Sequence, residues 1–320
     1  MENLIFSLNV TIPIFLVIVL GYFLMNTKLL TQEFVATADK FVFKVALPML
    51  LFRDISSMDL KQDFDLTFVL YCMLTTTVMF FATWAIASFC FKDKSIVGAF
   101  SQASVRGSVA VLGIAFVTNV YGSAGMTPLM IVAAVPLFNV FSVIILTFSS
   151  KDAYALKQSG QNKVLIHNAL KNIATNPIIL GILAGVPFSL FEIELPQILS
   201  RTVSSVASCA TPIALLTVGA SFEGKQAVKG LKPTLLAAFL KLIGLPLLFL
   251  PIAYFLGFRN SELIAILTML GSPSTVTCYI MAKNMGNDAQ LSSGIIVVTT
   301  LFSAVTLTFW IFLLRTLSLI

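Results

Sequence analysis

The chain has 320 residues, of which 58% are hydrophobic and 11% carry a charge. A soluble globular protein of this size needs more polar surface, so the composition excludes that class and places the chain in a lipid bilayer. The net charge of +6 does not indicate nucleic acid, because the basic residues lie between apolar runs and not on one face. The sequence therefore predicts an integral membrane protein that does not bind nucleic acid.

Ten apolar runs are each long enough to cross a bilayer as a helix, which takes about 20 residues. They cover residues 4–25, 34–52, 66–91, 96–120, 127–148, 173–191, 198–221, 233–255, 263–282 and 291–314. Asn176 before Pro177 predicts a capped start of the sixth helix. We predict an all-α integral membrane protein with ten transmembrane helices in two five-helix units, residues 1–150 and 173–320, joined by a linker over residues 151–172.

Loop charge predicts the orientation, because Lys and Arg are retained on the cytoplasmic side of a membrane. The loops after the odd-numbered runs hold eleven of these residues, whereas the opposite side holds five. This imbalance predicts that the linker faces the cytoplasm and that both termini lie outside. With five helices in each unit, the second unit crosses the membrane upside down relative to the first.

Two motifs far apart in the chain match each other. Residues 11–21 read TIPIFLVIVLG and residues 175–185 read TNPIILGILAG, with six of eleven positions identical at a spacing of 164 residues. The same spacing joins the Gly-Ser pair at residues 107–108 to the pair at residues 271–272. A duplicated unit of inverted topology is characteristic of secondary transporters, which hold their substrate near the midplane between the repeats.

The fourth and ninth runs carry these Gly-Ser pairs, in the segments SQASVRGSVAVLG (101–113) and TMLGSPSTVTCYI (268–280). Each pair lies about ten residues into its run, or roughly 15 Å deep, which is half the hydrocarbon thickness. Irregular backbone at that depth survives only where it is buried in protein or lines a cavity. We therefore predict that both helices break and cross there, and that the N-termini of the half-helices attract an anion.

The crossing supplies most of the predicted substrate-binding residues. They are Arg106, Gly107, Ser108, Gly271, Ser272, Pro273 and Ser274, together with Asn139 from the fifth run. The alternative is that the Gly and Ser residues only allow the helices to pack closely.

Ionisable residues inside the predicted spans carry an excess of positive charge. Lys44, Arg106 and Lys241 lie too deep to reach the interface easily, whereas Asp39 is the one acid well inside a span. Ionisable groups at such depth usually face a water-filled cavity or a partner. A transported anion would supply the missing negative charge, with Asp39, Lys44 and Lys241 as candidate charge partners. The alternative is structural, with Asp39 paired to Arg106 or Lys44.

Five stretches carry a resemblance to a known family. They are IFLVIVLGYFLMNTKLL (14–30), ADKFVFKVALPMLLF (38–52), NPIILGILAG (176–185), TPIALLTVGASF (211–222) and YIMAKNMGNDAQLSSGIIVVTTLFS (279–303). Through them the whole chain resembles the auxin efflux carrier family, whose bacterial permeases are relatives of the plant PIN carriers. The resemblance implies a location in a bacterial cytoplasmic membrane.

The resemblance implies a fold like that of the bile-acid sodium symporters. In that fold spans 1, 2, 6 and 7 form a scaffold, spans 3, 4, 5, 8, 9 and 10 form a moving core, and spans 4 and 9 cross beside the substrate. It also implies carboxylate substrates such as auxin, malonate or malate. PIN-type carriers have a proline and an asparagine where span 4 of this chain has Arg106 and Gly107, and the extra cation favours an acid smaller or more highly charged than auxin.

We predict a secondary transporter, or permease, that moves a mono- or dicarboxylate anion outward through elevator-type alternating access, with no cofactor. Sodium- or proton-coupled uptake of a carboxylate is the alternative mode of transport, and a membrane sensor is the alternative outside transport. An enzyme is not expected, because the sole histidine, His167, lies in the linker and no nucleophile with a base lies in the spans. The coupling ion and the oligomeric state stay open, a homodimer being one option.

Overall fold

The computed structural model describes residues 2–57, 65–109, 117, 125–221 and 230–320. The helices of the first half are α1 (Glu2–Asn26), α2 (Gln32–Phe41), the π-helical turn η1 (Val42–Ala46), α3 (Leu47–Ser56), α4 (Leu66–Cys90), the 3-10 turn η2 (Lys94–Ile96), α5 (Val97–Val105), α7 (Thr127–Phe148), α8 (Lys151–Gln158) and α9 (Asn162–Ala174). Those of the second half are α10 (Pro177–Leu190), α11 (Gln197–Ser208), α12 (Ala210–Ala220), α14 (Leu231–Phe239), the π-helical turn η3 (Leu240–Gly244), α15 (Leu245–Phe255), α16 (Asn260–Gly271), α17 (Thr277–Asn284) and α18 (Ala289–Thr316).

Five helices in the described part of the chain are long and apolar enough to cross a membrane. They are Leu66–Cys90, Thr127–Phe148, Gln197–Ala220, Leu231–Phe255 and Ala289–Thr316. A sixth is added if Ile166–Ala174 and Pro177–Leu190, which meet at an angle of 50°, count as one bent span. The predicted all-helical membrane protein is thereby confirmed, whereas the total of ten spans and the inverted relation of the two units stay predictions.

The surface of the bundle is apolar, as a lipid environment requires. The large side chains of Phe89, Ile198 and Phe255 are 89%, 79% and 82% exposed. Further apolar side chains fill two interior cores, one joining α4, α7, α15, α16 and α18 and the other joining α1, α3, α10, α12 and α17. An exposed apolar surface of this extent is stable in a bilayer and would aggregate in water.

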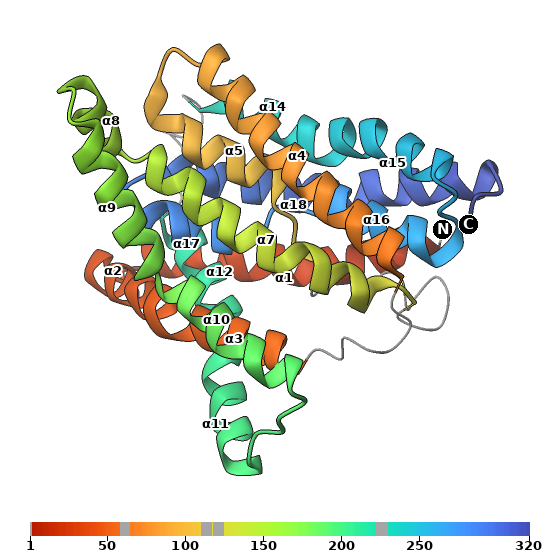
Figure 1. Ribbon diagram of the computed structural model, residues 1–320, viewed down its shortest axis with the longest axis horizontal. Coiled ribbons are helices and arrows are strands. Elements are labelled where there is room, and N and C mark those ends of the chain that lie inside the picture. The colour runs from red at the N-terminus through yellow and green to blue at the C-terminus, as the bar shows by residue number, and fades with distance from the viewer. Residues whose placement is uncertain (1, 58–64, 110–116, 118–124, 222–229) are drawn as a thin grey trace.

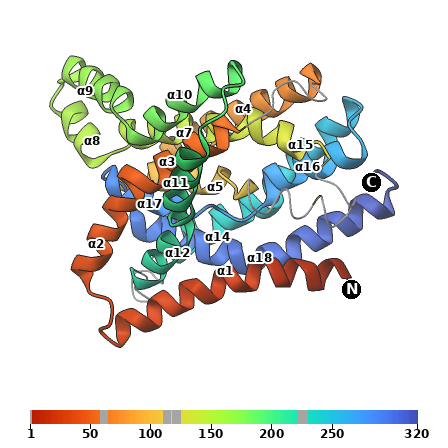
Figure 2. The same ribbon diagram turned by 90° about the horizontal axis from the view of Figure 1, so that it is seen from below.

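The predicted linker consists largely of the two helices α8 and α9. They lie at one end of the bundle, and the start of α1 and the end of α18 lie together at the other end (Figures 1 and 2). After α9 the chain bends into α10, where the side chain of Asn176 accepts a hydrogen bond of 2.9 Å from the N–H of Ile178 and Pro177 occupies the first position. The cap predicted for this helix is confirmed.

Two helix pairs pack at backbone distance through glycine. α1 packs on α12, where Gly21 lies against the carbonyl group of Leu216, and α10 packs on α3, where Gly185 lies against the carbonyl oxygen of Phe52. A Cβ atom on Gly185 would lie 3.0 Å from that oxygen, and one on Gly21 would overlap the Leu216 carbonyl. Each residue of one contact stands 164 positions from its counterpart in the other, so the repeated motif makes the same helix contact twice.

Replacing Gly21 or Gly185 by valine should destabilise the protein, because the added side chain pushes two backbones apart at a typical cost of about 1–3 kcal/mol. Thermal unfolding of the detergent-purified variants measures the loss. Leu20→Val is the matched control, since Leu20 precedes Gly21 in α1 and its side chain is 47% exposed. If the Gly21→Val and Leu20→Val proteins have the same melting temperature, the contact between the two backbones is contradicted.

Compartment reporters test on which side of the membrane each end of the bundle lies. A reporter inserted at Gly160, between α8 and α9, should give a cytoplasmic signal, and one fused after Ile320 should give an external signal, because these positions lie at opposite ends (Figure 1) and the loop charge places Gly160 inside. Matching signals would reject the predicted orientation.

Candidate functional site

The fourth and ninth predicted spans both break in the interior of the bundle. α5 ends at Val105 and α16 ends at Gly271. The residue after each helix has an extended backbone, with ψ of 116° at Arg106 and 153° at Ser272. α17 then begins at Thr277, whereas most of the continuation of the fourth span falls outside the described residues. Both described helix ends therefore lie at the Gly-Ser pairs that the sequence singles out.

The two extended segments meet as a short antiparallel pair. Gly107 bridges to Ser274, and the N–H of Ser108 donates a hydrogen bond of 2.9 Å to the carbonyl of Pro273. A Cβ atom on Gly107 would overlap the hydroxyl of Ser272, so the close approach requires glycine. These bonds satisfy backbone groups that the broken helices leave free, as a membrane interior without water demands.

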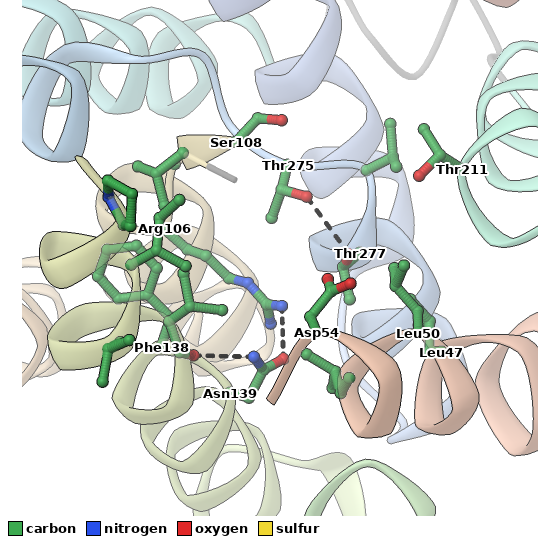
Figure 3. Close-up of a pocket in the computed structure, with 18 of the residues that line it drawn as sticks. Leu47, Leu50, Asp54, Arg106, Ser108, Phe138, Asn139, Thr211, Thr275 and Thr277 are labelled. Carbon is green, nitrogen blue, oxygen red and sulfur yellow. Dashed lines mark hydrogen bonds between the residues drawn. The ribbon is translucent and has the colours of Figure 1, made fainter. Parts of the chain in front are cut away.

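A cavity of about 1080 Å³ lies beside this crossing (Figure 3). Its wall is formed by α3, the junction of α11 and α12, α7 and the two extended segments. Six of the predicted substrate-binding residues line it: Arg106, Gly107, Ser108, Asn139, Pro273 and Ser274. Gly271 and Ser272 do not, since the Gly271 backbone lies against Pro246 and Ser272 is fully buried at the crossing.

Arg106 is a charged residue in the cavity wall, and its hydrogen-bond partners are neutral. Its side chain is directed to Asn139 (Figure 3), donating through Nη2 to the Asn139 Oδ1 over 2.6 Å and through Nη1 to the Met281 sulfur over 2.9 Å. Asn139 is held in turn by its own donation to the Val135 carbonyl. Arg106 is only 5% exposed, and no carboxylate among the described residues forms a salt bridge with it. A buried guanidinium in this state favours an anionic ligand.

The cavity also contains charged and hydroxyl groups that sequence reasoning missed. Arg53 donates from Nε and Nη2 to one oxygen of Asp54, over 2.9 and 2.7 Å, and both residues line the cavity. These two residues are adjacent at the end of the second predicted span, which was the signal available in the sequence. The hydroxyls of Ser208, Thr211, Thr275 and Thr277 also line the wall.

Asp39 lies outside the cavity and pairs with a lysine that the sequence analysis placed in a loop. Its Oδ2 is 2.5 Å from the Nζ of Lys283 and accepts a hydrogen bond of 3.2 Å from the Tyr279 hydroxyl. The same Tyr279 hydroxyl accepts from Lys283 over 2.8 Å and meets Ser221 at 2.5 Å. The structural alternative in which Asp39 pairs with Arg106 or Lys44 is therefore wrong.

The two lysines that the sequence places deep inside the predicted spans have opposite environments. Lys44 lies in η1 and is exposed on the outside of the bundle. Lys241 lies in η3 and is completely buried, where its Nζ donates to the carbonyls of Val105 and Met269 over 2.7 and 3.2 Å. Neither lines the cavity, so of the three deep cations only Arg106 faces it.

Known proteins match this chain over almost its full length. Residues 6–311 match the family described as "Membrane transport protein". A protein named "Uncharacterized transporter" from Methanothermobacter thermautotrophicus is 24% identical over 306 residues, which cover 95% of this chain and 97% of that protein. A "Putative malonate transporter" from Rhizobium meliloti is 24% identical over 315 residues, covering 96% and 95%. The "Uncharacterized transporter YfdV" of Escherichia coli is 24% identical over 320 residues, covering 98% and 99%.

The family match spans every stretch on which the resemblance rests. The apolar helices and the lipid-compatible surface described above agree with it. The chain therefore belongs to the membrane transport protein family, the auxin efflux carriers that its motifs resemble, and is an integral membrane transporter.

Proposed function

We propose that the protein is a secondary transporter for an organic carboxylate anion and that Arg106 binds the carboxylate. The observation that carries the proposal is a buried guanidinium with neutral partners, in the wall of a cavity at the crossing of two broken helices. A guanidinium presents a planar fork of donors that matches the two oxygens of a carboxylate. The bound anion would also neutralise a charge that is costly to bury alone.

The balance of charge in the cavity favours a small acid. Arg53 and Asp54 neutralise each other through their two hydrogen bonds, which leaves Arg106 as the uncompensated charge in the described lining. The hydroxyls of Thr275 and Thr277, which lie 3.3 Å apart, can donate to further carboxylate oxygens. The name of the Rhizobium meliloti relative makes malonate the first compound to test, among mono- and dicarboxylates.

The position of the cavity supports alternating access of the elevator type. One wall comes from α3 and from the α11–α12 junction, in spans of the expected scaffold, and the other comes from α7 and the crossing, in spans of the expected core. At the other end of the crossing helix α17, the Asp39–Lys283 pair joins α2 of the scaffold to α17 of the core. A core that slides against the scaffold would have to break that pair and would carry Arg106 with it.

Electrostatics and the predicted orientation support outward transport. An inside-negative potential favours the exit of an anion by about 2.3 kcal/mol per charge per 100 mV. Cavity-lining residues near the helix ends, such as Arg53, Gly125 and Ser261, lie next to loops predicted to face the outside. In proteoliposomes loaded with malonate, we expect efflux driven by the potential without a sodium or proton gradient; flux that needs either gradient would favour coupled uptake instead.

Arg106→Ala should weaken malonate binding by at least about tenfold, a low bound on the 2–5 kcal/mol that typically follows the loss of one partner of a buried charge pair. Arg106→Lys should restore binding only in part, because a lysine lacks the planar fork. Ligand titration of the purified protein measures the affinity, and Arg201→Ala, at an exposed position of α11, is the control. Unchanged affinity with a lowered melting temperature would leave Arg106 with a structural role alone.

Gly107→Ala should reduce malonate flux strongly while expression is retained, because the new methyl group would overlap the Ser272 hydroxyl at the crossing. Combining Gly107→Ala with Ser272→Gly removes the overlapping hydroxyl and should recover part of the flux. Flux assays on reconstituted single and double variants make this comparison. If Gly107→Ala alone transports normally, the tight crossing is not needed for transport.

A further inference from the structure

Lys241 is a fully buried lysine that the proposed function leaves unexplained. It lies in the π-helical turn η3, between α14 and α15, and is 0% exposed. It does not line the cavity, and neither of the ion pairs in the described part of the chain includes it. A lysine in that position is costly unless its charge is compensated.

The compensation comes from the ends of both broken helices. The Nζ of Lys241 donates to the carbonyl of Val105, the last residue of α5, and to the carbonyl of Met269, in the last turn of α16. The last carbonyls of a helix have no partner within it, and the helix dipole places about half a negative charge at that end. Two such ends facing one ammonium offset part of the cost of burying its positive charge.

The sequence explains why these carbonyls are free. In an unbroken helix the Met269 carbonyl would accept from the residue four positions later, which is Pro273 and has no N–H. The Val105 carbonyl likewise loses its helical partner where the backbone becomes extended at Arg106. In a water-free interior each of these acceptors needs a donor, and Lys241 donates to both.

The ammonium also lies against the closest point of the crossing. A Cβ atom on Gly107 would stand 3.0 Å from the Nζ of Lys241 and would overlap the hydroxyl of Ser272. That Ser272 hydroxyl is buried and has no hydrogen-bond partner among the described residues. Two backbone carbonyls thus accept from one ammonium beside the crossing, as oxygen ligands surround a bound cation.

The contact with Val105 bears directly on Arg106. The Val105 carbonyl and the Arg106 N–H belong to the same peptide unit. The carbonyl accepts from Lys241 over 2.7 Å, and the N–H donates to the Gln102 carbonyl over 2.9 Å. The peptide unit from which the Arg106 side chain extends into the cavity is therefore held at both of its polar atoms.

We propose that the Lys241 ammonium is a built-in cation that holds the ends of α5 and α16 together at the crossing and so positions Arg106. Lys241 is a positioning residue that does not touch the substrate. The part of the proposal that concerns Arg106 rests on the proposed function. The cation site itself does not, and its test has a readout independent of malonate.

Chemical rescue tests the cation site. Lys241→Ala removes three carbons and the ammonium, a fragment that n-propylammonium matches and that n-propanol matches without the charge. We expect Lys241→Ala to melt several degrees below the wild type, n-propylammonium to restore its melting temperature, and n-propanol to have little effect. Lys241→Met, which fills the space without charge, should be destabilised and should gain nothing from n-propylammonium. Lys44→Ala, at the exposed lysine of the second span, is the control and should not respond.

Malonate titration under the same conditions tests the positioning role. The affinity of Lys241→Ala for malonate should fall and should recover with n-propylammonium together with the melting temperature. If Lys241→Ala yields no folded protein, the heat-resistant fraction after extraction with n-propylammonium replaces the melting temperature as the readout.

Three results would overturn the proposal: wild-type stability of Lys241→Met, equal rescue by n-propanol, and no rescue by either compound. The failure of the proposed function gives a different pattern. If n-propylammonium restores the stability of Lys241→Ala while the wild type itself does not bind malonate, the cation site stands and the carboxylate proposal falls.

Discussion

A helix that breaks inside a bilayer leaves carbonyl and N–H groups without partners, and the arrangement of this site depends on how the crossing satisfies them. The Ser274 hydroxyl donates to the Ala103 carbonyl over 2.5 Å, and the Ser274 N–H donates to the Thr299 hydroxyl over 3.0 Å. Lys241 donates to two more carbonyls. Ser274 and Lys241 thus form hydrogen bonds that satisfy the backbone at the crossing. Arg106 differs from them, because its charged side chain is directed to the cavity.

The two matching halves of the sequence share glycine at a close helix contact but differ at the buried lysine. Gly21 and Gly185 both sit against a carbonyl of a neighbouring helix, so the same packing constraint acts in each half. At the same spacing the counterpart of Lys241 is Thr77, whose hydroxyl donates to the Met73 carbonyl of its own helix over 2.8 Å. A single ammonium suffices for both helix ends, because it lies where they meet.

Periodicity and composition predict the helices well here, but they do not predict which way each side chain faces. Arg106 and Asn139 were both expected at the site, and the structure brings them together at 2.6 Å. Lys44 and Lys241 look alike in sequence and both lie in π-helical turns, yet one is exposed and the other fully buried. The difference comes from tertiary packing, because η3 lies against the ends of α5 and α16. The partner of Asp39 was missed for a similar reason, since Lys283 was counted as loop charge and the fold returns it to Asp39.

The neutral partners of Arg106 have a consequence for the energetics of a transport cycle. With Asn139 and Met281 as the contacts of Arg106, the binding site carries one uncompensated positive charge when it is empty and none when it holds a monoanion. The membrane potential then acts on the charge of the binding site mainly in the step in which the empty site returns, and hardly in the step that carries the substrate. With a negative interior it pulls the vacant arginine inward, so the voltage would drive export by resetting the carrier.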